Sequence, residues 1–222
     1  MKKNKNLVVL GAGGHARPIL EILEENFPSN KKIILDETFD ANKKEKILGN
    51  LIFGNFKEID SIKNKVIFIA IGDNEIRSNI YNTLKKKKIN TPNLISITSS
   101  ISKYFKIGDA NFINKKAFIG TSSKIGNNNI INSGSLIEHE VVIGNNNHIA
   151  PKSIIGGRVK IGNKVLIGMG SKILPGIKIC SNTIIGAGSV VTKSILAPAT
   201  YVGTPAKMIR RKATKLTKKK IK

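Results

Sequence analysis

A chain of 222 residues, 40% of them hydrophobic, can bury a core and holds either one large domain or two small ones. Its formal net charge of +24 comes from 38 Lys and Arg against 14 Asp and Glu. Because the lysines are scattered along the chain and aromatic residues are few, we expect a general surface bias and no nucleic-acid binding. We expect no membrane insertion, since apolar runs such as Val66 to Ile71 are too short to span a bilayer.

The first residues, Met-Lys-Lys-Asn-Lys-Asn followed by Leu7 to Leu10, are faintly similar to a signal peptide. Gly11, Gly13 and Gly14 interrupt the apolar stretch too early for that function. The single cysteine, Cys180, cannot form an internal disulfide, which agrees with a reducing compartment. We therefore expect a cytoplasmic protein.

The run Leu7 to Leu10 leads into Gly-Ala-Gly-Gly-His-Ala, and apolar residues then recur at helical spacing as far as Leu23. This pattern predicts a strand, a glycine turn and a helix whose first N–H groups face whatever lies over the turn. Together with Asp36 after the next apolar run, it fits a G-x-G-x-x-A version of the dinucleotide fingerprint. An NAD-dependent oxidoreductase is the alternative raised by this motif, but only about ninety residues precede the repeats described below, enough for one βαβαβ half.

A third strand is predicted at Val66 to Ile71, and it leads through Gly72 into a second stretch with helical spacing. Residues 93–97 predict a further strand. We therefore expect an α/β half-Rossmann βαβ domain over residues 1–97.

From residue 101 onward an aliphatic residue returns at every sixth position. Residues six apart share one face of a strand, whereas a helix would scatter them around its circumference. Small residues, mostly glycine, follow many of them, which suits a corner where the chain turns. The spacing predicts a parallel β-helix, over residues 98–207, followed by a basic tail over 208–222. The repeated residues are Ile101, Ile107, Ile113, Ile119, Ile125, Ile131, Ile137, Ile143, Ile149, Ile155, Ile161, Ile167, Ile173, Ile179, Ile185 and Val191.

The repeat unit, seen for example in Ile167-Gly-Met-Gly-Ser-Lys, closely resembles the bacterial hexapeptide acyltransferases. Their repeats wind a left-handed β-helix with three hexads per coil, so the resemblance implies about five coils and a column on the order of 25 Å long. A purely structural solenoid has the same repeat. Function must therefore be argued from the residues that decorate the column.

Three segments of the N-terminal part, Gly-Ala-Gly-Gly-His-Ala, Ile-Leu-Asp-Glu and Ala-Ile-Gly-Asp-Asn-Glu-Ile-Arg, resemble the N-terminal domain of the sialic-acid and amino-sugar acetyltransferases with hexapeptide repeats. In that family this small domain holds a uridine nucleotide. The resemblance implies that the sugar diphosphate lies along Gly13, Gly14 and His15, that the uridine faces Asp36 and Glu37, and that Gly72 closes the pocket.

The chain has three histidines, His15, His139 and His148. Acetyl transfer from a thioester needs a base, and histidine is the natural choice at neutral pH. His139 stands in Ile-Glu-His-Glu, a polar trio that breaks an otherwise regular repeat, which favours a functional role. If coils repeat every eighteen residues, Thr121 and Gly157 flank His139.

The resemblance implies that His139 is the catalytic base and that Glu140 orients it and raises its basicity. It also places His148 near the acetyl group of acetyl-CoA, and Asn132 is positioned to help hold the acceptor amine. The eighteen-residue spacing puts Arg158 above Glu140, so that an Arg–Glu pair competes with the His–Glu bond. Both arrangements remain open at this point.

Family members are homotrimers with acetyl-CoA in the groove between columns, so the resemblance implies a homotrimer and makes Met169 and Ala187 candidates for contact with the cofactor. The segment Val-Gly-Thr-Pro-Ala-Lys resembles the cap of the family's β-helix. Some hexapeptide proteins are carbonic anhydrases with zinc on three histidines. Because His15 lies in the other domain, we expect no metal here.

Taken together, the resemblance implies an acetyl-CoA-dependent N-acetyltransferase acting on a nucleotide-linked 4-amino sugar. The expected substrate is of the UDP-4-amino-4,6-dideoxy-N-acetylglucosamine type, and the expected role is surface-glycan or glycoprotein synthesis. An O-acetyltransferase of sialic acid or a related sugar is the alternative within the same chemistry. A non-catalytic β-helix scaffold and a metal-dependent lyase are the alternatives from other classes.

Overall fold

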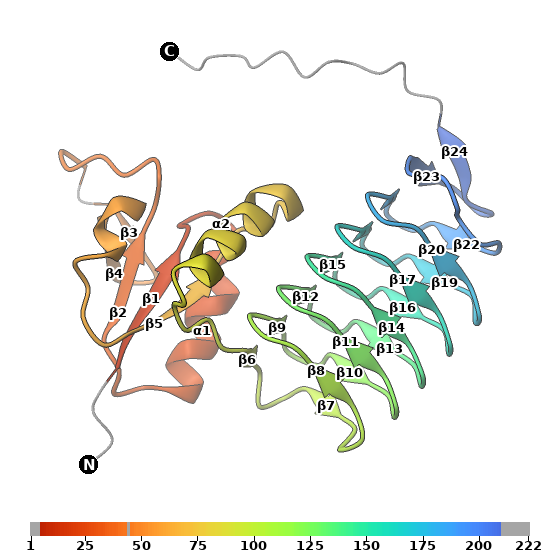
Figure 1. Cartoon of the computed structure of the whole chain (residues 1–222), viewed down its shortest axis with the longest axis horizontal. Coiled ribbons are helices and arrows are strands. Elements are labelled where there is room, and N and C mark those ends of the chain that lie inside the picture. The colour runs from red at the N-terminus through yellow and green to blue at the C-terminus, as the bar shows by residue number, and fades with distance from the viewer. Residues whose placement is uncertain (1–4, 44, 210–222) are drawn as a thin grey trace.

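The structure is a computed structural model that describes residues 5–43 and 45–209. It has two parts, an N-terminal α/β domain and a left-handed parallel β-helix that stands beside it (Figure 1). Both fold predictions are confirmed. Among the described residues, neither helix combines the length and the apolarity needed to cross a bilayer.

The N-terminal domain is built on a five-stranded sheet with the order β3-β4-β2-β1-β5. Strand β1 lies between β2 and β5 and is parallel to both, as in one half of a Rossmann fold. The elements are β1 (Asn6–Leu10), α1 (Ala16–Asn26), β2 (Lys32–Leu35), β3 (Lys46–Ile47), β4 (Asn50–Gly54), the short 3-10 helix η1 (Phe56–Ile59), β5 (Lys65–Ile69) and α2 (Asn74–Lys86).

The glycine turn after β1 forms as predicted and passes close to the end of β5. Gly11 has φ +110°, and a side chain there would come within 2.9 Å of the carbonyl oxygen of Ala70. Only glycine fits this approach and this backbone conformation. The hairpin of β3 and β4 was not predicted, because its strands are short and several of its apolar side chains are exposed.

In the β-helix each hexad contributes a short strand and a corner, and successive hexads pass through three faces. Face 1 consists of β7 (Ser100–Ile101), β10 (Phe118–Ile119), β13 (Leu136–Ile137), β16 (Ile154–Ile155), β19 (Lys172–Ile173) and β22 (Val190–Val191). Face 2 consists of β8 (Lys106–Ile107), β11 (Lys124–Ile125), β14 (Val142–Ile143), β17 (Lys160–Ile161) and β20 (Lys178–Ile179). Face 3 consists of β6 (Leu94–Ile95), β9 (Phe112–Ile113), β12 (Ile130–Ile131), β15 (His148–Ile149), β18 (Leu166–Ile167), β21 (Ile184–Ile185), β23 (Thr200–Val202) and β24 (Lys207–Ile209).

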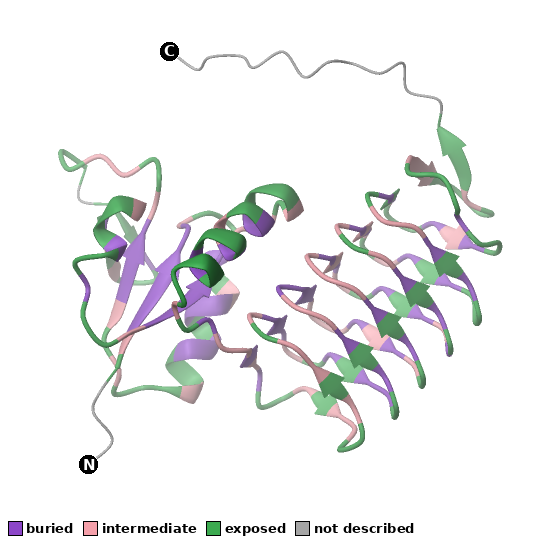
Figure 2. Ribbon diagram, in the orientation of Figure 1, coloured by how far each residue is buried: buried purple, intermediate pink, exposed green. Residues whose placement is uncertain are grey.

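The repeated aliphatic residues point into the column and stack from coil to coil. Ile119, Ile137 and Ile155 are register partners on successive coils of face 1, and all three are fully buried. On most strands of faces 1 and 2 a buried residue follows a more exposed one (Figure 2), whereas both residues of β9 and of β12 on face 3 are buried. Burying this apolar ladder is the main force that holds the coils together.

The two ends of the column differ in detail from the sequence-based expectation. The strand predicted at residues 93–97 is β6, and it pairs with β9 of the column instead of joining the N-terminal sheet. At the other end β24 pairs antiparallel with β23, so Met208 and Ile209 lie in a strand. The remainder of the predicted basic tail, residues 210–222, lies outside the described residues.

From residue 110 to residue 188, each corner of the column contains one residue in the left-handed region of the backbone map. Glycine and asparagine adopt this conformation readily, whereas other residues do so at a cost of about 1–2 kcal/mol. Glu140 and Arg158 are two of the charged residues found there. The full series is Ala110, Lys116, Ser122, Asn128, Gly134, Glu140, Asn146, Lys152, Arg158, Lys164, Gly170, Gly176, Asn182 and Gly188.

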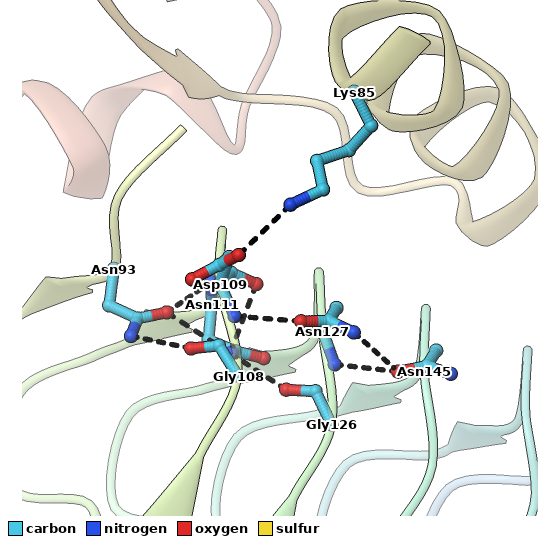
Figure 3. Close-up of polar contacts among 8 residues, drawn as sticks. All are labelled: Lys85, Asn93, Gly108, Asp109, Asn111, Gly126, Asn127 and Asn145. Carbon is cyan, nitrogen blue, oxygen red and sulfur yellow. Dashed lines mark hydrogen bonds and ion pairs between the residues drawn. The ribbon is translucent and has the colours of Figure 1, made fainter. Parts of the chain in front are cut away.

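At the corner between face 2 and face 3, asparagine amides link one coil to the next (Figure 3). The backbone N–H of Asn111 donates to Oδ1 of Asn93 at 2.8 Å, and the N–H of Asn127 donates to Oδ1 of Asn145 at 2.7 Å. Lys85 of α2 reaches this corner and pairs with Asp109 at 3.1 Å. The asparagine amides satisfy backbone N–H groups at the turns of successive coils.

Candidate functional site

His139 and Glu140 lie in the turn between β13 and β14, at the corner of faces 1 and 2. Nδ1 of His139 is 3.0 Å from Oε2 of Glu140. The carboxylate accepts a hydrogen bond, so Nδ1 carries the proton and Nε2 is left with a free lone pair. The side chain of His139 is 47% exposed, and Nε2 can therefore accept a proton from a bound molecule.

The neighbouring coils shape this corner as the eighteen-residue spacing predicts. The N–H of Glu140 donates to the carbonyl of Thr121 at 2.9 Å on one side. On the other side the imidazole lies against Gly157, where an added Cβ would come within 2.7 Å of Nε2. The imidazole ring of His139 therefore occupies the space that a side chain at position 157 would need.

A shallow cavity of about 390 Å³ opens beside the imidazole. It lies across the first coils of face 1, so a group bound there is within reach of His139. Its lining consists of Ser100, Ile101, Ser102, Phe118, Ile119, Gly120, Thr121, Glu138 and His139.

A larger cavity of about 760 Å³ lies in the N-terminal domain, at the carboxyl ends of β1, β2 and β5. This is where ligands bind in open parallel sheets. Five of the predicted substrate residues line it: Gly13, Gly14, His15, Asp36 and Gly72. Glu37 does not. Part of the lining comes from residues that the sequence analysis did not single out. These are Thr38 and Phe39 after β2, and Glu45, Lys46, Ile47 and Ile52 in or next to the β3–β4 hairpin.

Asp36 is tied to the loops that form this cavity. Its Oδ2 accepts from the N–H of Ala12 at 2.6 Å, and its Oδ1 accepts from the N–H and the hydroxyl of Thr38 at 2.9 and 2.6 Å. Burial alone would raise the pKa of Asp36, but the hydrogen bonds from Thr38 and Ala12 outweigh it and lower the pKa. The carboxylate is thus charged at neutral pH and fixes the glycine turn against the end of β2.

His148 lies beneath this cavity, on the outer side of face 3. Its ring centroid is 6.2 Å from that of His15, and its Nε2 is 3.3 Å from Nδ2 of Asn132. Oδ1 of Asn132 accepts from Asn114 at 2.9 Å, which directs Nδ2 of Asn132 toward His148. Burial, and then the charge of Arg77, lowers the pKa of His148 to about 4.

Arg77, which sequence reasoning did not assign a role, connects α2 to the column. Its side chain is almost fully buried, and its donors reach the carbonyls of Asn128 and Asn147 at 3.1 and 3.0 Å and that of Gly72 at 2.9 Å. Carbonyl oxygens satisfy this cation in place of a carboxylate. It therefore positions Gly72, at the edge of the cavity, relative to face 3.

The predicted site residues fall into three places within one chain. His15 lines the N-terminal cavity, His148 and Asn132 lie on face 3 near His15, and His139 with Glu140 lies at the corner of faces 1 and 2. Met169 and Ala187 lie one coil apart at the corner of faces 3 and 1, and both are exposed. No group of three potential metal ligands occurs in residues 5–43 and 45–209.

Comparison with known families gives two matches that cover different parts of the chain. Residues 6–84 match the PglD N-terminal domain. Residues 122–157 and 158–193 each match the bacterial transferase hexapeptide model of six repeats. No curated protein matches the chain.

Several solved structures share both parts. A GDP-perosamine N-acetyltransferase from Caulobacter crescentus, solved as a histidine-to-alanine variant with CoA and GDP-perosamine, is 27% identical, with a TM-score of 0.85 over 93% of this chain and 97% of that one. The acetyltransferase domain of PglB from Neisseria gonorrhoeae, in complex with acetyl coenzyme A, is 25% identical, with a TM-score of 0.84 over 93% and 100%. WeeI from Acinetobacter baumannii, 24% identical, shares the fold with a TM-score of 0.86 over 92% and 100%. The chain thus combines a PglD-type N-terminal domain with bacterial transferase hexapeptide repeats, and it is similar over almost its whole length to N-acetyltransferases of known structure.

Proposed function

We propose that the chain is an acetyl-CoA-dependent N-acetyltransferase that acts on a nucleotide-linked 4-amino sugar. The observation that carries this proposal is the His139–Glu140 pair, which leaves Nε2 free beside an open cavity at the corner of the column. The similar structures that hold CoA with GDP-perosamine, or acetyl coenzyme A, support the same chemistry.

In this mechanism a neutral amine of the acceptor attacks the carbonyl carbon of the thioester. Nε2 of His139 takes a proton from the amine as the new C–N bond forms, and Glu140 stabilises the imidazolium through Nδ1. The C–S bond then breaks, and the proton passes from Nε2 to the departing sulfur. Amide and free CoA thiol are the products, and His139 returns to its starting tautomer.

The N-terminal cavity supplies the features that a sugar nucleotide needs. Helix α1 begins at Ala16 beside Gly13 and Gly14, has no acidic residue in its first turn and makes no side-chain cap. The positive end of the helix dipole favours the diphosphate there, whereas the N–H of Ala16 donates to the carbonyl of Gly13 and Pro18 has no N–H. Arg17 on the same lining adds positive charge. We assign the base end of the nucleotide to the side lined by Asp36 and Phe39, with Glu37 close by in the chain.

We propose that the active unit is a homotrimer in which the cavity of one copy serves His139 of another. The cavity borders face 3, whereas His139 lies at the opposite corner of the column. Face 1 between them carries outward apolar side chains, including Phe118 and Ile154, which are 38% and 40% exposed.

Met169 and Ala187 border this face and would contact acetyl-CoA in the groove between copies, with the reacting end of acetyl-CoA directed toward His139 and toward His148. The expected cytoplasmic location stays part of this proposal.

A thiol-release assay tests the function. Acetyl-CoA is offered with a UDP-4-amino-4,6-dideoxy-N-acetylglucosamine-type acceptor, a GDP-4-amino sugar or free sialic acid, and the wild type is compared with His139→Ala. Lys160→Gln, an exposed change on face 2, serves as the surface control. Turnover with an amino sugar that His139→Ala loses by at least about 100-fold supports the proposal.

Other outcomes of the same assay assign the alternatives. Turnover with sialic acid alone would move the assignment to O-acetylation. Absence of turnover together with absence of acetyl-CoA binding would contradict an enzymatic function and leave the column as a scaffold.

A further inference from the structure

One carboxylate oxygen at the candidate active site accepts two hydrogen bonds. Oε2 of Glu140 is 3.0 Å from Nδ1 of His139 and 3.1 Å from Nε of Arg158. The bond from His139, and then that from Arg158, lowers the pKa of Glu140 below its ordinary value. Glu140 is therefore charged, and its charge is shared between two partners.

The backbone places Arg158 at this oxygen. Glu140 and Arg158 occupy equivalent corner positions on successive coils, with φ +58° and +61°, and the N–H of Arg158 donates to the carbonyl of His139 at 3.0 Å. The same positions on the coils before and after hold Ser122 and Gly176. Of these four equivalent corner positions, only the two beside the imidazole of His139 carry charged residues, Glu140 and Arg158.

Stability alone does not account for the pair. The side chains of Arg158 and Glu140 are 72% and 50% exposed, and exposed ion pairs contribute little to folding. The other charged group at this corner is Glu138, which lines the same cavity as His139. Thr121 and Gly157, on the coils before and after His139, carry no charge.

We propose that Arg158 is a positioning residue for His139: its guanidinium holds the Glu140 carboxylate at Nδ1 and takes up part of the negative charge that would otherwise stabilise the imidazolium. The role in catalysis rests on the proposed function. The effect on the imidazole does not, because it depends only on the three side chains.

The direct test is an NMR titration of the histidine rings. The chain has three histidines, and the signal of His139 is identified by its loss in His139→Ala. We expect Arg158→Gln to raise the titration midpoint of His139 by about half a pH unit, from the loss of one charge several ångströms away in a solvated site. Arg158→Lys keeps the positive charge, so the titration midpoint of His139 in this variant should stay close to that of the wild type. Lys160→Gln, which removes a charge two residues along the chain on face 2, should leave the midpoint unchanged.

A second readout uses the acetyl-transfer assay. The acid limb of the kcat profile should move to higher pH by the same amount in Arg158→Gln, with KM for both substrates unchanged. An unshifted His139 midpoint in Arg158→Gln, with circular dichroism showing an intact fold, would overturn the proposal. If the wild type shows no turnover at all, the proposed function fails, and the NMR midpoints still decide whether Arg158 controls the imidazole.

Discussion

The rings of His15 and His148 lie next to each other at the junction of the two domains, with their centroids 6.2 Å apart and their planes tilted by 44°. His15 also lies edge-on to Phe112 at 5.2 Å, and its buried Nε2 makes no hydrogen bond within the described part of the chain. Burial, and then the charges of His148 and Arg77, lowers the pKa of His15 to about 3. Both histidines are therefore neutral in the folded protein at pH 7.

This pair makes the stability of the fold depend on pH. Both pKa values are lower in the folded state than the value of 6.5 for an unperturbed histidine. The unfolded chain thus binds more protons between pH 6.5 and about 4, and the free energy of unfolding falls as the pH is lowered through this range. The expected slope is about 1.4 kcal/mol per pH unit for each histidine. Urea unfolding at pH 7.5, 6.0 and 5.0 measures it.

The control for this prediction is His148→Gln, which removes one of the two titrating groups and keeps a polar side chain. Its unfolding free energy should fall less steeply between pH 6.5 and 5 than that of the wild type. Equal slopes in wild type, His148→Gln and His15→Gln would show that other groups dominate the acid sensitivity.

A methyl group at position 157 should disturb the base without disturbing the fold. In Gly157→Ala the new Cβ would lie 2.7 Å from Nε2 of His139 and 2.8 Å from Cε1, so the exposed imidazole must swing away from Glu140. A displacement of about 1 Å can lower the rate on the order of 100-fold. We expect a large loss of kcat with nearly unchanged acetyl-CoA binding and melting temperature. A variant with wild-type kcat would show that the ring position in the structure is not the one used in catalysis.

The hexad pattern predicted the inner half of the column correctly, because every inward residue needs only an apolar neighbour one coil away. The outer half depends on what covers each face, and a periodic pattern does not contain that information. Phe112 and Ile130, outward on face 3, pack into the same core as Leu7 and Val9 of the N-terminal sheet. The next outward residue in this row is His148, and for this reason it lies against His15.

The candidate site likewise consists of a part that could be predicted from the sequence and a part that could not. The motif after β1 and Asp36 identified one side of the N-terminal cavity, because glycine turns and helix starts have strong sequence signals. The opposite side comes from the β3–β4 hairpin, whose two-residue β3 carries no recognisable period. Arg77 belongs to the Ala-Ile-Gly-Asp-Asn-Glu-Ile-Arg segment but was given no role for another reason: apart from the side chain of Asn74, its partners are backbone carbonyls, and the sequence does not show which carbonyls lie within its reach.

Replacing Arg77 should loosen the junction between the domains. Arg77→Met removes the donors that satisfy the buried carbonyls of Asn128 and Asn147, and hydrogen bonds from a charged donor contribute about 1.5–3 kcal/mol each. We expect the free energy of unfolding to fall by about 2–4 kcal/mol, since relief of the buried charge offsets part of the loss. Urea denaturation measures the change. Arg17→Met, an exposed arginine, is the matched control and should change stability by less than about 0.5 kcal/mol.

The proposed sharing of sites between copies predicts complementation of two inactive variants. Gly13→Trp should block the N-terminal cavity, since Gly13 lines it and an added Cβ there meets no atom within 4 Å. His139→Ala removes the base. Each variant alone should be inactive, whereas mixed oligomers formed by co-expression should regain part of the wild-type rate, since one copy supplies an open cavity and another supplies His139. Two affinity tags isolate the mixed oligomers, and light scattering gives their size. Mixed oligomers that stay inactive would mean that cavity and base must come from the same chain, which would require a movement of the N-terminal domain along the column.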